Sequence, residues 1–192
     1  MIMKKINKVT VIIPTYNAEK FIGRCIDTVI SQIYENVEII AIDDGSSDNT
    51  INILKEFKKI KVLENETNQG PAYSRTKGLM QASGEYVAFL DADDYWDEDF
   101  ISATVAFLEK YEDAVAVSTG YIGIDLKGGT VEKPKLSEED KAYYGEKGNI
   151  CPDFFEFWST YFGVLTGTVM MRTSVAQQTK GQRSELRLTE KI

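Results

Sequence analysis

The sequence has no histidine among its 192 residues, and it has only two cysteines. Without histidine, the chain lacks a histidine general base, the serine and cysteine triads that depend on one, and the commonest zinc ligand. Cys25 and Cys151 lie far apart, without the spacing of a metal site, so we expect each to be a buried, reduced thiol. Acid–base chemistry in this chain is therefore left mainly to carboxylates.

Positive charge and long hydrophobic runs are also scarce. The 22 lysines and arginines are outnumbered by 30 acidic residues, which gives a formal net charge of −8. This balance argues against nucleic acid as a partner and against docking on anionic lipid through this chain alone. The first apolar run ends at Pro14 and is too short for a signal peptide or a membrane span. We therefore expect a cytoplasmic protein with no transmembrane segment.

The length suits a single domain over residues 1–192. In the first half, β-branched apolar runs alternate with segments of helical periodicity. Strands are expected at 9–13, 37–42, 61–63 and 86–90, and helices near 17–30, 46–57 and 71–82, the first capped by Asn17. This alternation predicts right-handed βαβ units, and hence an α/β fold with a mostly parallel sheet and helices on both faces.

The second half is less regular. It predicts a helix at 100–109, strands at 114–118 and 169–171, a hairpin within 121–131, a mobile polar loop at 133–149 and a weak helix from Thr173. The aromatic segment 154–162 is read either as a buried packing stripe, which we favour, or as a stacking platform for an acceptor sugar. The sequence does not decide whether Trp96 lines a donor pocket or packs in the core.

Polar residues follow three of the predicted strands, at 14–17, 43–46 and 91–94. Ligands of open α/β sheets bind at the carboxyl ends of the strands, where the strand order reverses. The first two segments alone are typical of turns, whereas three acids in 91–94 exceed what a helix cap needs. Five carboxylates at one edge repel one another unless a cation lies among them. Mg²⁺ suits such a place because it takes carboxylate oxygens and leaves positions for phosphates.

Four segments of the sequence resemble the ordered motifs of family 2 glycosyltransferases. They are VIIPTYN at 11–17, IDDGSSD at 42–48, NQGPAYSR at 68–75 and GEYVAFLDADD at 84–94. The resemblance is strong from Val9 to about Phe107. It implies a Rossmann-like GT-A fold and inverting transfer of a sugar from a nucleotide donor, expected to be UDP-linked, as in bacterial surface-polysaccharide synthesis. Residues 9–118 would then form the nucleotide-sugar half of the domain and 119–192 the acceptor side.

The resemblance also implies which residues contact the nucleotide. Thr15, Tyr16 and Asn17 would contact the base and ribose. Asp44 would accept a hydrogen bond from the uracil imide, and Arg75 would flank the nucleotide pocket.

The same resemblance assigns the acids of the fourth segment. Asp93 would hold the Mn²⁺ or Mg²⁺ that neutralises the leaving diphosphate. Asp91 would lie towards the ribose or the sugar, and Asp94 would assist through water.

Inversion further requires a carboxylate base, which the family places in a late Glu-Asp motif. In this sequence Glu190 is followed by Lys191. Three interpretations remain: Glu190 is the base, the base is lost, or the chain is a fragment whose end departs from the natural sequence. We favour the fragment, and expect this chain to bind nucleotide and metal but to transfer sugar poorly.

The expected acceptor is a saccharide or a lipid-linked sugar, which would bring the protein to the inner face of the membrane as a peripheral partner. A nucleotide-sugar-binding module without turnover is the main alternative. A metal-dependent phosphohydrolase with Asp91 as nucleophile is a weaker one. Such enzymes usually carry an Asp pair after the first strand, where this chain has Pro14-Thr15-Tyr16-Asn17.

Overall fold

The computed structural model describes residues 6–124, 130–131 and 165–178. A six-stranded sheet forms its centre, in the order β3-β2-β1-β4-β8-β5. The strands are β1 (Val9–Thr15), β2 (Val37–Asp43), β3 (Ile60–Glu64), β4 (Tyr86–Phe89), β5 (Ala116–Ser118) and β8 (Val169–Arg172). The first four are parallel, whereas β8 pairs antiparallel with β4 and with β5. The mostly parallel α/β sheet predicted from the sequence is confirmed.

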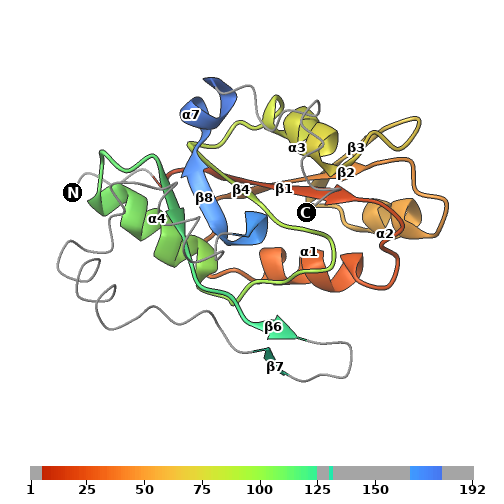
Figure 1. Cartoon of the computed structure of the whole chain (residues 1–192), viewed down its shortest axis with the longest axis horizontal. Helices are drawn as coiled ribbons and strands as arrows, with labels where there is room; N and C mark the ends of the chain where they lie inside the picture. Colours follow the sequence, from red (N-terminus) through yellow and green to blue (C-terminus); the bar gives the residue numbers. More distant parts are fainter. Residues whose placement is uncertain (1–5, 125–129, 132–164, 179–192) are drawn as a thin grey trace.

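Helices cover both faces of this sheet (Figure 1). On one face lie α1 (Ile22–Ile30), α2 (Thr50–Glu56) and α4 (Phe100–Lys110), and on the other lie α3 (Pro71–Leu79) and the short α7 (Thr173–Gln178). Successive side chains of a strand point to opposite faces. In β1, Val9, Val11 and Ile13 accordingly join the first core cluster, while Ile12 joins the second.

Helix α3 lies unusually close to the sheet at Gly78. A Cβ atom at this position would come within 2.6 Å of Ile12 Cγ2 and 2.8 Å of Ile42 Cδ1. A side chain here would have to displace the buried side chains of Ile12 in β1 and Ile42 in β2. Glycine therefore sets the distance between the sheet and the helix that carries Arg75.

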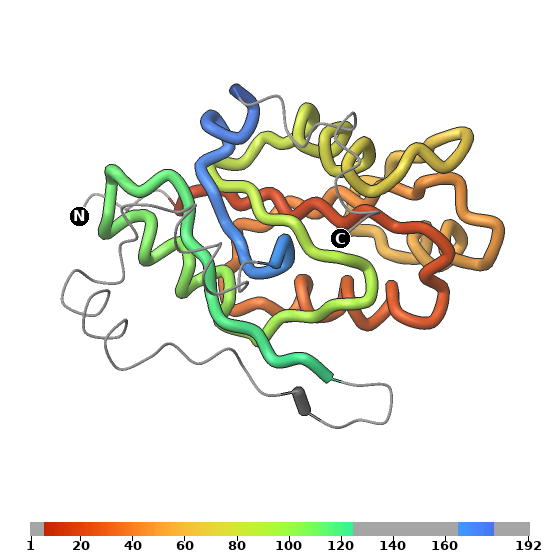
Figure 2. Tube along the Cα trace, viewed as in Figure 1, coloured from red at the N-terminus to blue at the C-terminus, as the bar shows by residue number. Residues whose placement is uncertain are grey.

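The described C-terminal segment returns to the middle of the sheet. Figure 2 shows residues 165–178 running beside β4, far from it in sequence. A 3₁₀ turn, Thr166–Thr168, leads into β8, which adds Met170 to the main core. The predicted strand near 169–171 and the helix from Thr173 are both confirmed.

The predicted hairpin within 121–131 is also confirmed, as β6 (Gly123–Ile124) paired antiparallel with β7 (Thr130–Val131). Several sequence predictions lie outside the described residues. They are the loop at 133–149, the aromatic segment 154–162, Cys151 and the candidate base Glu190 with its neighbour Lys191.

The predicted capping of the first helix by Asn17 is wrong. Helix α1 begins at Ile22, and Asn17 has a positive φ of 48°. Asparagine tolerates this left-handed conformation better than most residues. Its side-chain Oδ1 accepts a hydrogen bond from the Ser47 backbone N–H at 2.9 Å instead. Asn17 therefore ties the loop after β1 to the loop after β2.

Candidate active site

A cavity of about 340 Å³ lies where the chain order of the sheet reverses. Strand β1 is flanked by β2 on one side and by β4 on the other. Ten residues from the ends of β1 and β4 and from the starts of α1 and α3 line the cavity: Pro14, Tyr16, Asn17, Ala18, Phe21, Pro71, Arg75, Asp91, Ala92 and Asp93. The position is the one predicted from the sequence, and it suits a ligand of an open α/β sheet.

An ion pair spans this cavity. Arg75 Nη2, from α3, donates to Oδ1 of Asp91, which follows β4. The Arg75 side chain is 11% exposed and that of Asp91 is 37% exposed. The guanidinium thus compensates the negative charge of one carboxylate in the 91–94 segment.

The remaining acids of this segment, Asp93 and Asp94, are exposed. Partial desolvation of its carboxyl group by the surrounding protein raises the pKa of Asp94 even so, and the charges of Asp93 and Asp91 raise it further. The carboxylates therefore repel one another, which a cation would relieve. No group of three or more metal-ligating side chains occurs in the described part of the chain. The exposed carboxylates of Asp93 and Asp94 offer the oxygen ligands that Mn²⁺ and Mg²⁺ take when substrate phosphates supply further ones.

Cys25 lies under the acidic segment. Its Sγ donates to the backbone oxygen of Asp91 at 3.6 Å, and the residue is 1% exposed. Burial raises the pKa of the Cys25 thiol to about 12, and the charges of Asp94, Asp91 and Asp93 add to this effect. Cys25 is thus a protonated free thiol, as predicted, and it is no candidate nucleophile.

Thr15 was expected to contact the nucleotide, but its side chain does not line the cavity. The residue is 2% exposed, and its hydroxyl donates to the Ile42 backbone oxygen at 3.1 Å. The Thr15 carbonyl in turn accepts from the Asp44 backbone N–H at 2.8 Å. The neighbours Tyr16 and Asn17 do reach the cavity wall.

Asp44 likewise does not line the cavity and is 3% exposed. Its Oδ1 accepts from Asn65 Nδ2 at 2.6 Å and from the Gln69 backbone N–H at 3.0 Å. Its Oδ2 accepts from the Gly70 backbone N–H at 2.7 Å. Asp44 therefore anchors the segment that leads into α3, a role that the sequence did not reveal. Its contact with a base stays a prediction.

Two aromatic residues take different places. Phe21, just before α1, is 51% exposed and lines the cavity. Trp96 is buried, stacks on Phe100 with ring centroids 4.1 Å apart, and donates from Nε1 to the Gly167 carbonyl at 2.7 Å. Trp96 belongs to the core and not to the cavity.

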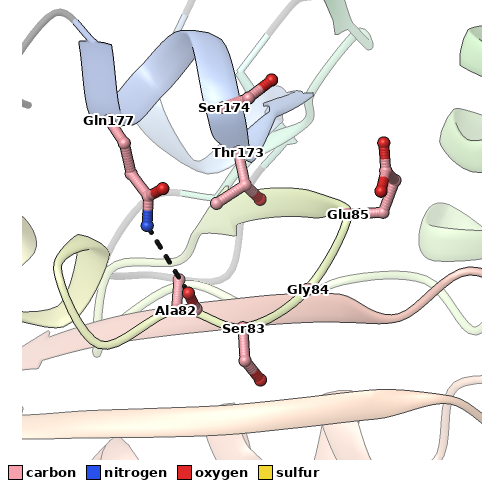
Figure 3. A pocket seen from close by; sticks show the side chains of 7 residues that line it. All are labelled: Ala82, Ser83, Gly84, Glu85, Thr173, Ser174 and Gln177. Atoms are coloured by element: carbon pink, nitrogen blue, oxygen red, sulfur yellow. Dashed lines mark hydrogen bonds between the residues drawn. The ribbon is translucent and has the colours of Figure 1, made fainter.

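A second cavity, of about 250 Å³, opens near the amino end of β4 (Figure 3). Seven residues line it: Ala82, Ser83, Gly84, Glu85, Thr173, Ser174 and Gln177. None of the predicted site residues lies there. Among the described helices, none is long and apolar enough to cross a bilayer.

The sheet order, the cavity at the reversal point and its acidic wall are typical of nucleotide-sugar-binding proteins of the GT-A class. Solved structures support this class. S. aureus TarS 1-349 in complex with UDP-GlcNAc is 25% identical, with a TM-score of 0.67 over 90% of this chain and 47% of that one. The mannosyltransferase PcManGT from Pyrobaculum calidifontis, in complex with GDP-Man and Mn²⁺, shares the fold at 21% identity, with a TM-score of 0.69 over 94% of this chain and 49% of that one.

Residues 10–177 match the family model described as glycosyl transferase family 2, and the chain belongs to this family. This confirms the resemblance, extends it into the second half of the sequence, and decides against the phosphohydrolase. The putative glycosyltransferase EpsE of Bacillus subtilis is 32% identical over 92% of the chain and 60% of its own length. The putative teichuronic acid biosynthesis glycosyltransferase TuaG of the same organism is 37% identical over 70% of the chain and 55% of its own. The chain spans 17% to 60% of the length of such relatives.

Proposed function

We propose that the chain binds a UDP-linked sugar and belongs to an enzyme that transfers this sugar, with inversion, to a saccharide or lipid-linked acceptor. The observation that carries the proposal is the cavity between β1 and β4, with Arg75, Asp91 and Asp93 on its wall. Relatives agree with a role in polysaccharide synthesis, since TuaG is named for teichuronic acid biosynthesis and a TarS structure holds UDP-GlcNAc.

The acidic wall is the proposed metal site. Asp93 would hold Mn²⁺ or Mg²⁺, and PcManGT, which shares the fold, is bound to Mn²⁺ together with GDP-Man. When bound, the cation supplies Lewis-acid neutralisation of the leaving diphosphate. Arg75 adds a fixed positive charge beside the same phosphates, while its ion pair keeps the Asp91 carboxylate in one orientation towards the cavity.

The nucleoside would lie against the end of β1. Tyr16 is 50% exposed on the cavity wall, so its ring is available to stack on a flat base. A carboxylate offers about four acceptor positions, of which the described residues fill three on Asp44. The fourth, on Oδ2, is the acceptor that we assign to the imide N–H of uracil.

The catalytic base is proposed to be a carboxylate on the acceptor side, with Glu190 as the candidate in this sequence. A lipid-linked acceptor would place the enzyme at the inner, cytoplasmic face of a membrane as a peripheral partner.

A thermal-shift screen of nucleotide sugars, with and without Mn²⁺, tests the proposed function. A ligand at a hundred times its dissociation constant adds about 2.7 kcal/mol of stability if it binds only the native state. We expect UDP-sugars to raise the melting temperature in the presence of Mn²⁺ and much less after chelation. If no nucleotide sugar raises it under either condition, the proposed function is wrong.

A further inference from the structure

A chain of hydrogen bonds runs from a partly exposed lysine on α3 to the buried carboxylate of Asp44. Lys77 Nζ donates to Asn65 Oδ1 at 2.6 Å, and Asn65 Nδ2 donates to Asp44 Oδ1, also at 2.6 Å. The same Nδ2 donates to the hydroxyl of Ser74, which is fully buried, at 3.1 Å. Asn65 itself is 9% exposed and lies just beyond β3. The chain thus joins α3, the end of β3 and the end of β2.

The chemistry of the two ends fixes the orientation of the amide between them. An ammonium group only donates and a carboxylate only accepts, whereas an amide does both. The carbonyl oxygen of Asn65 must therefore face Lys77, and its nitrogen must face Asp44. With the amide reversed, its oxygen would meet the Asp44 carboxylate and its nitrogen would meet a cation. The Asp44 carboxylate and Lys77 therefore favour the same orientation of the Asn65 amide, and Lys77 holds its oxygen in place from the side opposite Asp44.

The fixed amide in turn fixes the Asp44 carboxylate. Asn65 and the Gln69 N–H together occupy Oδ1, and the Gly70 N–H occupies one position on Oδ2. Without the Asn65 bond, Oδ1 keeps only the Gln69 N–H and Oδ2 only the Gly70 N–H, so two donors hold the carboxylate where three held it before. The direction of the open acceptor position on Oδ2 would then be less sharply defined.

We infer that Asn65 and Lys77 are positioning residues for nucleobase selection, acting through Asp44. The inference rests on the proposed function, in which the open position on Oδ2 accepts the imide N–H of uracil. Cytosine carries an acceptor nitrogen at the equivalent ring position, so a correctly oriented Asp44 favours UDP over CDP, although the two bases have nearly the same size. Asn65 and Lys77 thus contribute to the ratio of the two affinities without touching the nucleotide.

The test measures the dissociation constants of UDP and CDP by calorimetry in the presence of Mn²⁺, for the whole 192-residue chain. Lys77→Met removes the donor that holds the amide oxygen, and Asn65→Ala removes the amide itself. Lys77→Arg keeps a cationic donor and is the rescue variant. Lys55→Met is the matched control, because Lys55 is a lysine of α2, on the opposite face of the sheet, whose ammonium pairs with the Glu64 side chain at 3.0 Å.

We expect the preference for UDP over CDP to fall about 3- to 10-fold in Lys77→Met and at least as far in Asn65→Ala. Lys77→Arg and Lys55→Met should keep the wild-type preference. If Asn65→Ala does not fold, Lys77→Met still provides the test, because Lys77 is partly exposed and its replacement perturbs the core less. Thermal stability is measured in parallel. A loss of stability with an unchanged preference would make the chain of bonds merely structural and overturn the inference. Failure of the wild-type chain to bind UDP would instead overturn the proposed function.

Discussion

Arg75 on α3 and Asp91 after β4 form an ion pair on the wall of the cavity between β1 and β4, with Nη2 of Arg75 donating to Oδ1 of Asp91. The two residues belong to different motifs and are 16 positions apart in the sequence. The pair also places a cation beside the acidic segment, so the charge of this wall depends on Arg75. Metal binding and nucleotide binding should therefore respond in opposite directions when Arg75 is changed.

Arg75→Gln removes a positive charge from the wall that carries Asp91 and Asp93. We expect UDP to bind about tenfold more weakly, because a hydrogen-bonding cation beside its phosphates is lost. Mn²⁺ alone should bind more tightly, because the carboxylates are no longer compensated. Titration calorimetry of each ligand measures both effects. Arg24→Gln is the control, since Arg24 lies over the Tyr95 ring and does not line the cavity. Weaker Mn²⁺ binding by Arg75→Gln would contradict this account of the ion pair.

Gly78→Ala should destabilise the protein even though alanine favours helices. Its Cβ would lie 2.6 Å from Ile12 Cγ2, and overpacking of this kind costs about 1–3 kcal/mol. Gly23→Ala in α1 is the matched control, because nothing lies within 4 Å of its added Cβ. That variant should be neutral or more stable by up to about 1 kcal/mol. Urea unfolding measures both, and equal stabilities of the two variants would show that α3 does not sit this close to the sheet.

Glu38 should contribute to stability only above acidic pH. Burial raises its pKa, but hydrogen bonds from Thr10, Ser83 and Lys8 outweigh burial, so the pKa lies below its ordinary value. A lowered native pKa stabilises the fold above the unfolded value of about 4.3, and this stability is lost as the pH falls through the native value. Glu38→Gln should cost roughly 1 kcal/mol at pH 7 and less below about pH 4.

Urea unfolding at several pH values measures this difference. Glu66→Gln controls for the loss of one negative charge at an exposed position. A cost of Glu38→Gln that stays constant from pH 7 to pH 3 would show that the hydrogen bonds do not favour the charged carboxylate.

Asp44→Asn should affect both the fold and the nucleotide. Its new amide nitrogen would face a donor, either Asn65 Nδ2 or a backbone N–H of Gln69 or Gly70. We expect a loss of about 1–3 kcal/mol in the free energy of unfolding, and a loss of similar size in UDP binding. Unfolding and calorimetry on the same preparation separate the two effects. Unchanged stability would show that Asp44 does not anchor the segment leading into α3. Unchanged UDP affinity would show that Asp44 does not recognise the base.

Much of the fold was predictable because its signals are local. Buried parallel strands such as β1 and β2 appear as continuous apolar runs, and the three polar segments that follow strands marked the correct edge of the sheet. Asn17 misled the prediction because its side chain bonds to Ser47, 30 residues away, and no local pattern reports that contact.

The details of the site were less predictable for the same reason. A helical pattern includes Phe21 among its apolar positions and does not reveal that it faces a cavity. The burial of Thr15 and Asp44 depends on how β1, β2 and the start of α3 meet. The bond from Asn65 to Asp44 spans 21 residues and involves an asparagine outside the recognised motifs.

UDP binding by the wild-type chain and by Asp93→Asn, each titrated with Mn²⁺ and again after chelation of the metal, tests the central claim most directly. The account predicts that Mn²⁺ strengthens UDP binding to the wild type and that the variant loses most of this effect, while its affinity for UDP without metal changes little. Removing one carboxylate has this effect where the protein provides few ligands and the phosphates provide others. An unchanged Mn²⁺ dependence in Asp93→Asn would show that Asp93 does not hold the metal and would contradict the proposed site.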